Sequence, residues 1–183
     1  MLRRALLVSM LLAFPALAKE LKGVKMPDTL EVGGKTLKLN GMGLRTKAIF
    51  KVYVAGLYLE ETTQDPSVVL SKDQTRQVEM FMMRDLEKGK IVDAIQAGFE
   101  KNNGDKMAAL KDRLAKFVAV VPDLKEGQSL KLTYIPGKGT TIKGGSGAEA
   151  TVEGKDFADA LFSVWLGKTP VDDDLKNGML GKE

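Results

Sequence analysis

The chain has 183 residues, 28 Lys and Arg against 24 Asp and Glu, and neither cysteine nor histidine. The two missing residue types exclude disulfides, thiolate nucleophiles, metal sites built on thiolate or imidazole, and imidazole general bases. The net charge of +4 is too small to indicate a nucleic-acid-binding protein, and a hydrophobic content of 44% is ordinary for one soluble globular domain.

Residues 1–18 have the pattern of a secretory signal peptide. Arg3 and Arg4 precede an apolar run that Pro15 ends, and Ala16-Leu17-Ala18 matches the small-residue pattern of a cleavage site. The run is too short to span a bilayer about 30 Å thick as a stable helix. We therefore expect export to the periplasm, cleavage after Ala18, and a single domain over residues 19–183.

Strands are predicted first along the remaining chain. Residues 30–39 alternate apolar and polar around Gly33-Gly34, which predicts a hairpin with a primed turn. Residues 40–43 (Asn-Gly-Met-Gly) suggest a break. Residues 44–60 are rich in β-branched and aromatic side chains and predict either one long strand or two strands with a bend near residues 47–50. A further strand is expected over 76–84, after a short helix that starts at Asp65-Pro66-Ser67.

Two amphipathic helices are expected next. Ile91, Ile95 and Phe99 lie at helical spacing, and Asn102-Asn103-Gly104 predicts where the helix ends. Residues 107–121 repeat the pattern until a proline follows.

Short strands are predicted again from residue 129, with turns at 136–139 and 144–147. A helix from about Lys155 to a Gly167 cap follows, then a last helix with Thr169 as N-cap and Pro170 in its first turn. Aspartates 172–174 would favour the positive end of that helix and do not have the spacing of a calcium loop. This order of elements predicts an α+β fold.

Three side chains are candidates for binding an anion. Arg45, Lys51 and Tyr53 share strand parity and could offer a guanidinium, an ammonium and a phenol on one face. The alternative is an ordinary solvent-exposed sheet face, on which such residues are common. The glycine-rich stretches lack the spacing of a phosphate-binding loop and are interpreted as turns.

Two segments resemble the chalcone isomerase family. Residues 39–60 (LNGMGLRTKAIFKVYVAGLYLE) are similar to its Gly-x-Arg and Gly-x-Tyr-x-Glu signature, and residues 162–180 (FSVWLGKTPVDDDLKNGML) look like its C-terminal ending. The resemblance covers most of residues 26–183. It implies an open-faced β-sandwich, in which a large antiparallel sheet is covered by helices, with a cleft between sheet and helices.

The resemblance also implies which of the family's catalytic residues are present in this sequence. Plant enzymes of the family polarise a chalcone carbonyl with an Arg, two Thr, a Tyr and an Asn. Here only Arg45 matches, because Tyr53 and Val164 replace the two Thr, and the Tyr and Asn fall near Ile91 and Gly98. Since the loss of one oriented donor commonly costs about 10²-fold or more in rate, we expect no catalytic residues and a non-catalytic protein.

The fatty-acid-binding branch of the family is more similar. Arg45 and Tyr53 match the residue types that hold a carboxylate there. Eight residues of uninterrupted strand span about 26 Å, so the two side chains can meet only if the chain folds back near residues 47–50.

We therefore expect a monomer that binds a fatty acid or similar amphipathic carboxylate and needs no cofactor, metal or nucleic acid. Two alternatives remain: an isomerase or intramolecular lyase acting on an enone or phenol, and an envelope protein with a structural or partner-binding role and no ligand. The expected ligand-binding residues are Arg45, Lys51, Tyr53, Ile91, Ile95, Phe162 and Trp165.

Overall fold

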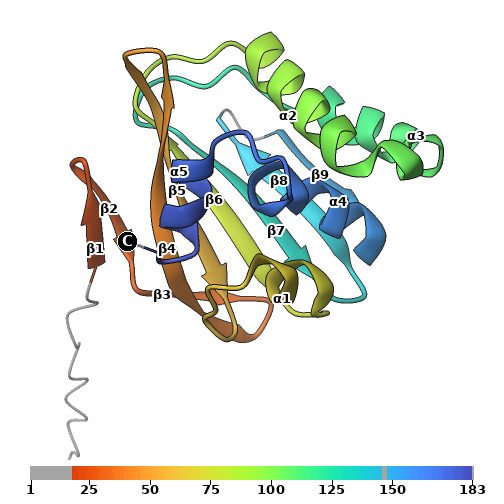
Figure 1. Ribbon diagram of the computed structural model, residues 1–183, viewed down its shortest axis with the longest axis horizontal. Helices are drawn as coiled ribbons and strands as arrows, with labels where there is room; N and C mark the ends of the chain where they lie inside the picture. The colour runs from red at the N-terminus through yellow and green to blue at the C-terminus, as the bar shows by residue number, and fades with distance from the viewer. Residues whose placement is uncertain (1–17, 146–147, 183) are drawn as a thin grey trace, which may run out of the picture.

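A seven-stranded antiparallel sheet with helices on one face forms the body of the molecule (Figure 1). The structure, a computed structural model, describes residues 18–145 and 148–182. The predicted signal peptide therefore lies outside the described residues, except for Ala18. The strands of the sheet follow one another in chain order: β3 (Thr29–Val32), β4 (Lys35–Lys47), β5 (Phe50–Leu59), β6 (Arg76–Met82), β7 (Ser129–Ile135), β8 (Gly139–Gly144) and β9 (Ala148–Val152).

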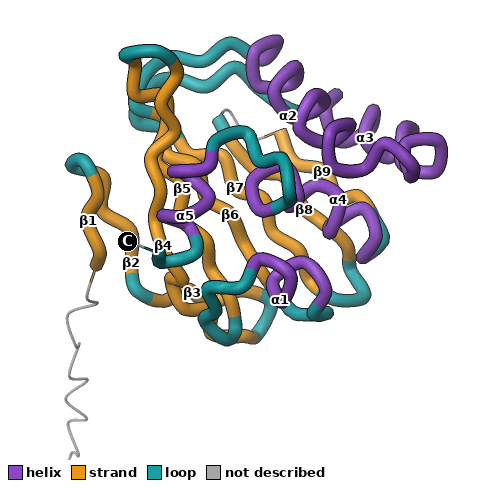
Figure 2. Tube along the Cα trace, in the orientation of Figure 1, coloured by secondary structure: helices purple, strands orange, loops and turns teal. Residues whose placement is uncertain are grey.

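The two faces of the sheet are covered differently. Helices α1 (Pro66–Ser71), α2 (Lys88–Asn103), α3 (Met107–Ala119), α4 (Lys155–Leu166) and α5 (Asp173–Met179) lie on one side, as the tube in Figure 2 shows. A hairpin of β1 (Ala18–Leu21) and β2 (Val24–Pro27) packs on part of the other face, where Val24 and Met26 bury Val54 and Tyr58. The predicted α+β architecture, a large antiparallel sheet under a layer of helices, is confirmed.

The chain does fold back between Arg45 and Tyr53. Strands β4 and β5 are joined by a tight turn at Ala48 and Ile49, in which Ala48 takes a left-handed conformation with φ of 53°. Left-handed conformations are uncommon for residues with a Cβ. Residues 47–50 also contain neither Gly nor Pro, so no local sequence signal predicts this turn. The two-strand alternative for residues 44–60 is the correct one.

A β-bulge in β5 changes which side chains share a face. Arg45 pairs with Tyr53 and Thr46 pairs with Lys51, so Val52 is the extra residue. Val52 and Tyr53 consequently both join the core on the helix-covered face. Lys51 is exposed.

The break expected at residues 40–43 is wrong. These residues continue β4, with a second irregularity in the pairing beside Asn40. A Cβ on Gly41 would lie 2.2 Å from the carbonyl oxygen of Gly178, and one on Gly43 equally close to that of Leu175. The glycines therefore serve the close approach of the backbone of α5 to the strand, not a turn.

The helices agree with their predicted ranges except at the last one. The Asp65 side chain caps α1 by accepting from Ser67 N, and α2 extends to Asn103 as expected. Thr169 does not cap the last helix, because its backbone N–H donates to Asn102 Oδ1 and holds this segment as a loop. Helix α5 begins four residues later, with Asp172 as its N-cap. No helix in the described ranges is long and apolar enough to cross a membrane.

Candidate functional site

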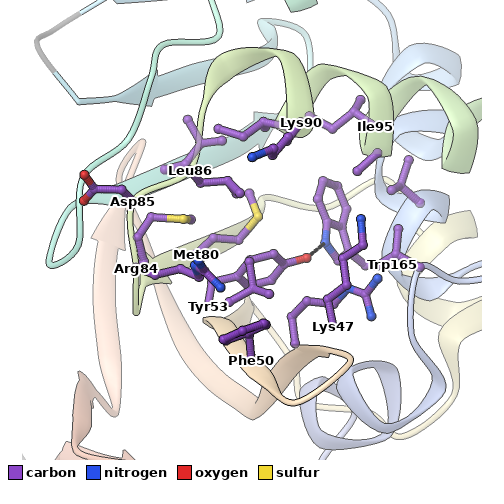
Figure 3. Close-up of a pocket in the computed structure, with 18 residues that line it drawn as sticks. Lys47, Phe50, Tyr53, Met80, Arg84, Asp85, Leu86, Lys90, Ile95 and Trp165 are labelled. Atoms are coloured by element: carbon purple, nitrogen blue, oxygen red, sulfur yellow. Dashed lines mark hydrogen bonds between the residues drawn. The ribbon is translucent and has the colours of Figure 1, made fainter.

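A cavity of about 320 Å³ lies between the helix-covered face of the sheet, α2 and α4 (Figure 3). Its wall is mostly apolar, with Met80 and Met82 from β6, Ile91 and Ile95 from α2, and Trp165 from α4. Basic side chains occupy part of the lining. Such a combination of an apolar wall and a few polar groups is typical of small-molecule sites.

The structure brings together most of the residues that the sequence singled out. Lys51 and Phe162 do not line the cavity. The bulge at Val52 leaves Lys51 exposed, and Phe162 lies elsewhere on α4, with its ring 4.8 Å from the Arg76 guanidinium. The candidates that line the cavity are Arg45, Tyr53, Ile91, Ile95 and Trp165.

Arg45 lies beside Tyr53 and is engaged in an ion pair. Its Nη1 donates to Asp172 Oδ2 and to the Thr46 carbonyl oxygen, both at 2.8 Å. The other carboxylate oxygen of Asp172 accepts from Leu175 N at 2.9 Å, which is the N-cap bond of α5. The start of α5 therefore fixes the position of the carboxylate that faces Arg45.

Tyr53 is a neutral hydrogen-bonding group at the base of the cavity. Its hydroxyl oxygen accepts from Trp165 Nε1 at 3.1 Å (Figure 3). Burial raises the pKa of Tyr53 to about 12, the Trp165 hydrogen bond and Arg45 oppose part of this rise, and Asp172 adds the smallest contribution to it. The phenol is thus protonated at neutral pH. Its own O–H remains able to donate a hydrogen bond to a ligand.

Three further cations line the cavity that the sequence analysis did not select. They are Lys47, Arg84 and Lys90. The Arg84 guanidinium lies 4.7 Å from the centre of the Phe50 ring, and Phe50 also contributes to the lining. The only sequence signal for Lys47 was its place beside the predicted bend. Lys47, Arg84 and Lys90 meet because the β4–β5 hairpin packs next to the β6–α2 connection, which the sequence pattern does not show.

Three of the five positions that the family resemblance assigned to donors have no polar side chain here, namely Ile91, Gly98 and Val164. Val164 and Ile91 line the cavity with hydrocarbon side chains. A Cβ on Gly98 would lie 2.8 Å from Val164 Cγ1, so this glycine allows α2 to approach α4. Within residues 18–145 and 148–182, no group of three or more acidic side chains is arranged to hold a metal ion.

The sequence profile of the proteins described as chalcone isomerase-like matches residues 18–181. The chain belongs to the chalcone isomerase-like family. Among solved structures, a fatty-acid binding protein of Arabidopsis thaliana is similar, with a TM-score of 0.68 and 16% sequence identity over 90% of this chain and 95% of that chain. At this identity the likeness shows the shared fold. No curated protein matches the sequence.

Proposed function

We propose that this chalcone isomerase-like protein binds a fatty acid or a similar amphipathic carboxylate in its cavity, without catalysis. The observation that carries the proposal is the cavity itself, whose wall is apolar and whose lining also holds four cationic side chains, Arg45, Lys47, Arg84 and Lys90. The fold shared with a plant fatty-acid binding protein is consistent with it.

The apolar wall suits an acyl chain. Met80 and Met82 are flexible, and such side chains adapt to a hydrocarbon ligand more readily than branched ones. Each methylene group moved from water into this wall would contribute about 0.8 kcal/mol. An unbranched chain would therefore gain most of its affinity from β6, α2 and α4.

The polar groups suit one carboxylate. Tyr53 would donate its O–H, and Arg45 would contribute charge and a further donor. Because Asp172 already neutralises much of the Arg45 charge, Lys47 is needed as the second cation that leaves a net attraction for an anion. Arg45 and Lys47 together with Asp172 would carry one excess positive charge, which matches a single carboxylate.

Trp165 provides a direct test, because it is the one tryptophan of the chain and lines the cavity. Palmitate should change its fluorescence in a saturable titration, whereas the methyl ester of palmitic acid should bind more weakly. Lys47→Gln should weaken palmitate binding about fivefold, equivalent to roughly 1 kcal/mol. Lys38→Gln, an exposed change on the same strand outside the cavity, should leave it unchanged.

Native mass spectrometry after mild purification completes the test. The proposal would be refuted if the purified protein carries no bound acid and its Trp165 fluorescence does not change when palmitate is added. Equal binding of the acid and its methyl ester would refute the role given to Arg45, Lys47 and Tyr53.

The proposal includes export to the periplasm. It rests on the basic start, apolar run and Ala16-Leu17-Ala18 site of residues 1–18. Cell fractionation should recover the protein in the periplasm, with Lys19 as its first residue. Recovery of the unprocessed chain in the cytoplasm would contradict this part of the proposal.

A further inference from the structure

Two neighbouring apolar side chains are exposed at the turn between β4 and β5. Ile49 is 88% exposed and Phe50 is 54% exposed. The third large hydrophobic side chain exposed in the described part of the chain, Val68, lies on α1, at the opposite end of the sheet. Figure 1 shows the β4–β5 turn at the upper left edge of the molecule. Side chains of this size are seldom left in water side by side without a reason.

Basic residues surround this pair. Lys47 and Lys51 flank it in the sequence and are exposed, and the Arg84 guanidinium lies over the Phe50 ring. Asp85, which follows Arg84 in the sequence, is engaged by Lys125 Nζ at 2.9 Å and by Glu126 N at 3.0 Å. The surface around the turn is therefore apolar at its centre and positive at its edge.

We propose that the β4–β5 turn docks the protein on the surface of an anionic lipid bilayer. Ile49 and Phe50 would enter the boundary between headgroups and acyl chains, while Lys47, Lys51 and Arg84 would contact lipid phosphates. Exposed apolar side chains ringed by Lys and Arg are the combination that binds such surfaces. Burial of the two side chains and attraction to anionic lipid would act together.

The cavity connects this surface to the proposed function, on which this part of the inference rests. Lys47, Phe50 and Arg84 belong both to the basic turn region and to the cavity lining. A docked molecule would therefore hold one side of its cavity against the bilayer. An acyl ligand could pass between the bilayer and the Met80 side of the cavity without crossing open water.

The charge pattern favours a bilayer over a second copy of the chain. Two copies meeting through this turn would place Lys47, Lys51 and Arg84 of each against the same cations of the other, which is repulsive. Two exposed side chains also offer much less than the roughly 800 Å² per partner of a standard protein interface.

Co-sedimentation with vesicles tests the inference. The protein is purified as cells process it and its mass is checked, so that residues 1–18 do not contribute. It should bind vesicles of equal parts phosphatidylcholine and phosphatidylglycerol, bind pure phosphatidylcholine far less, and be released by salt. Ile49→Ser and Lys51→Glu should each weaken binding about fivefold or more.

The controls lie at the other end of the sheet. Val68→Ser removes an exposed apolar side chain on α1, and Lys138→Glu makes the same charge change in the β7–β8 turn. Both should leave vesicle binding unchanged. An equal loss in Lys138→Glu would mean that net charge alone drives binding, and an equal loss in Val68→Ser would mean that any exposed apolar side chain contributes; either result would overturn the inference. So would vesicle binding that survives Ile49→Ser, or association of the protein with itself in place of vesicle binding.

A palmitate titration without vesicles separates this inference from the proposed function. Ile49 and Lys51 do not line the cavity, so Ile49→Ser and Lys51→Glu should keep the Trp165 response. If Ile49→Ser and Lys51→Glu lose both vesicle binding and the Trp165 response to palmitate, the turn has no docking role separate from the cavity, and the inference is overturned. A protein that binds vesicles and ignores palmitate would keep the docking surface and refute the fatty-acid ligand.

Discussion

Arg76 is a charge held entirely inside the protein. Its side chain has no exposed area, and its guanidinium donates to Asp159 and to the Val69 carbonyl oxygen at the end of α1. The rings of Tyr134 and Phe162 lie 5.1 and 4.8 Å from it. The arginine thus links β6, α1 and α4, and occupies the position where Phe162 was expected to meet a ligand.

Replacing Arg76 should therefore damage folding more than binding. Arg76→Leu should lower the free energy of unfolding by about 3 kcal/mol, because it leaves Asp159 and a helix-end carbonyl without this donor. The matched change Arg113→Leu breaks a bidentate pair with Asp156 at a more exposed site and should cost less than about 1 kcal/mol. Urea denaturation measures both. Similar losses in the two variants would mean that the burial of Arg76 contributes little.

At the scale of elements, α5 depends on glycines in the strand beneath it. The helix is seven residues long, and Gly41 and Gly43 let its backbone lie against β4. From this position Asp172, at its N-terminus, reaches Arg45. A helix this short would be marginal alone, so the contact with β4 maintains it and the Asp172 carboxylate at the cavity.

An added methyl group should have opposite effects at two glycines. Gly43→Ala would place a Cβ against the Leu175 backbone and should destabilise the protein by about 2 kcal/mol or more through overpacking. Gly89→Ala, in α2, meets no atom within 4 Å and should stabilise it by about 0.5 kcal/mol through helix propensity. Thermal unfolding of both variants checks the signs. A Gly43→Ala protein as stable as the wild type would show that α5 shifts freely on β4.

For the molecule as a whole, periodicity predicted most elements, but it missed the β1–β2 hairpin and the irregularities between the others. Alternation and helical spacing identified the Gly33-Gly34 hairpin, α2 and α4, because each pattern reflects one buried face. The turn at Ala48 and the bulge at Val52 leave no such pattern. The bulge reverses strand parity, which is why Lys51 could not be separated from Tyr53 by counting along the strand.

The site was predictable where one element supplied the information. Ile91 and Ile95 lie on the same helix face, and both line the cavity. The partner of Arg45 was not predictable, since Asp172 is 127 positions away and looked like part of an acidic helix start. A pairing between distant elements depends on the packing of α5 on β4, which no local pattern encodes.

Burial of the tyrosines gives the whole molecule a defined alkaline limit. Burial raises the pKa of Tyr53 and that of Tyr134 to about 12. The hydrogen bond to Asp73 adds to the rise for Tyr134. Burial raises the pKa of Tyr58 as well. In the unfolded chain these phenols would ionise near pH 10. Between about pH 10 and 12 the native state therefore binds more protons than the unfolded state.

The free energy of unfolding should accordingly be unaffected by these groups below about pH 10 and should fall as the pH rises towards 12. Each tyrosine contributes up to about 1.4 kcal/mol per pH unit within that interval. Urea unfolding at a series of pH values measures how steeply the free energy of unfolding falls with pH. Tyr53→Phe should make this slope shallower by the contribution of one tyrosine. Phenolate absorbance should rise together with the loss of circular dichroism. If the phenols instead titrate near pH 10 in a protein that stays folded, the three side chains are accessible to water, and the closed packing of Tyr53 against Trp165 is wrong.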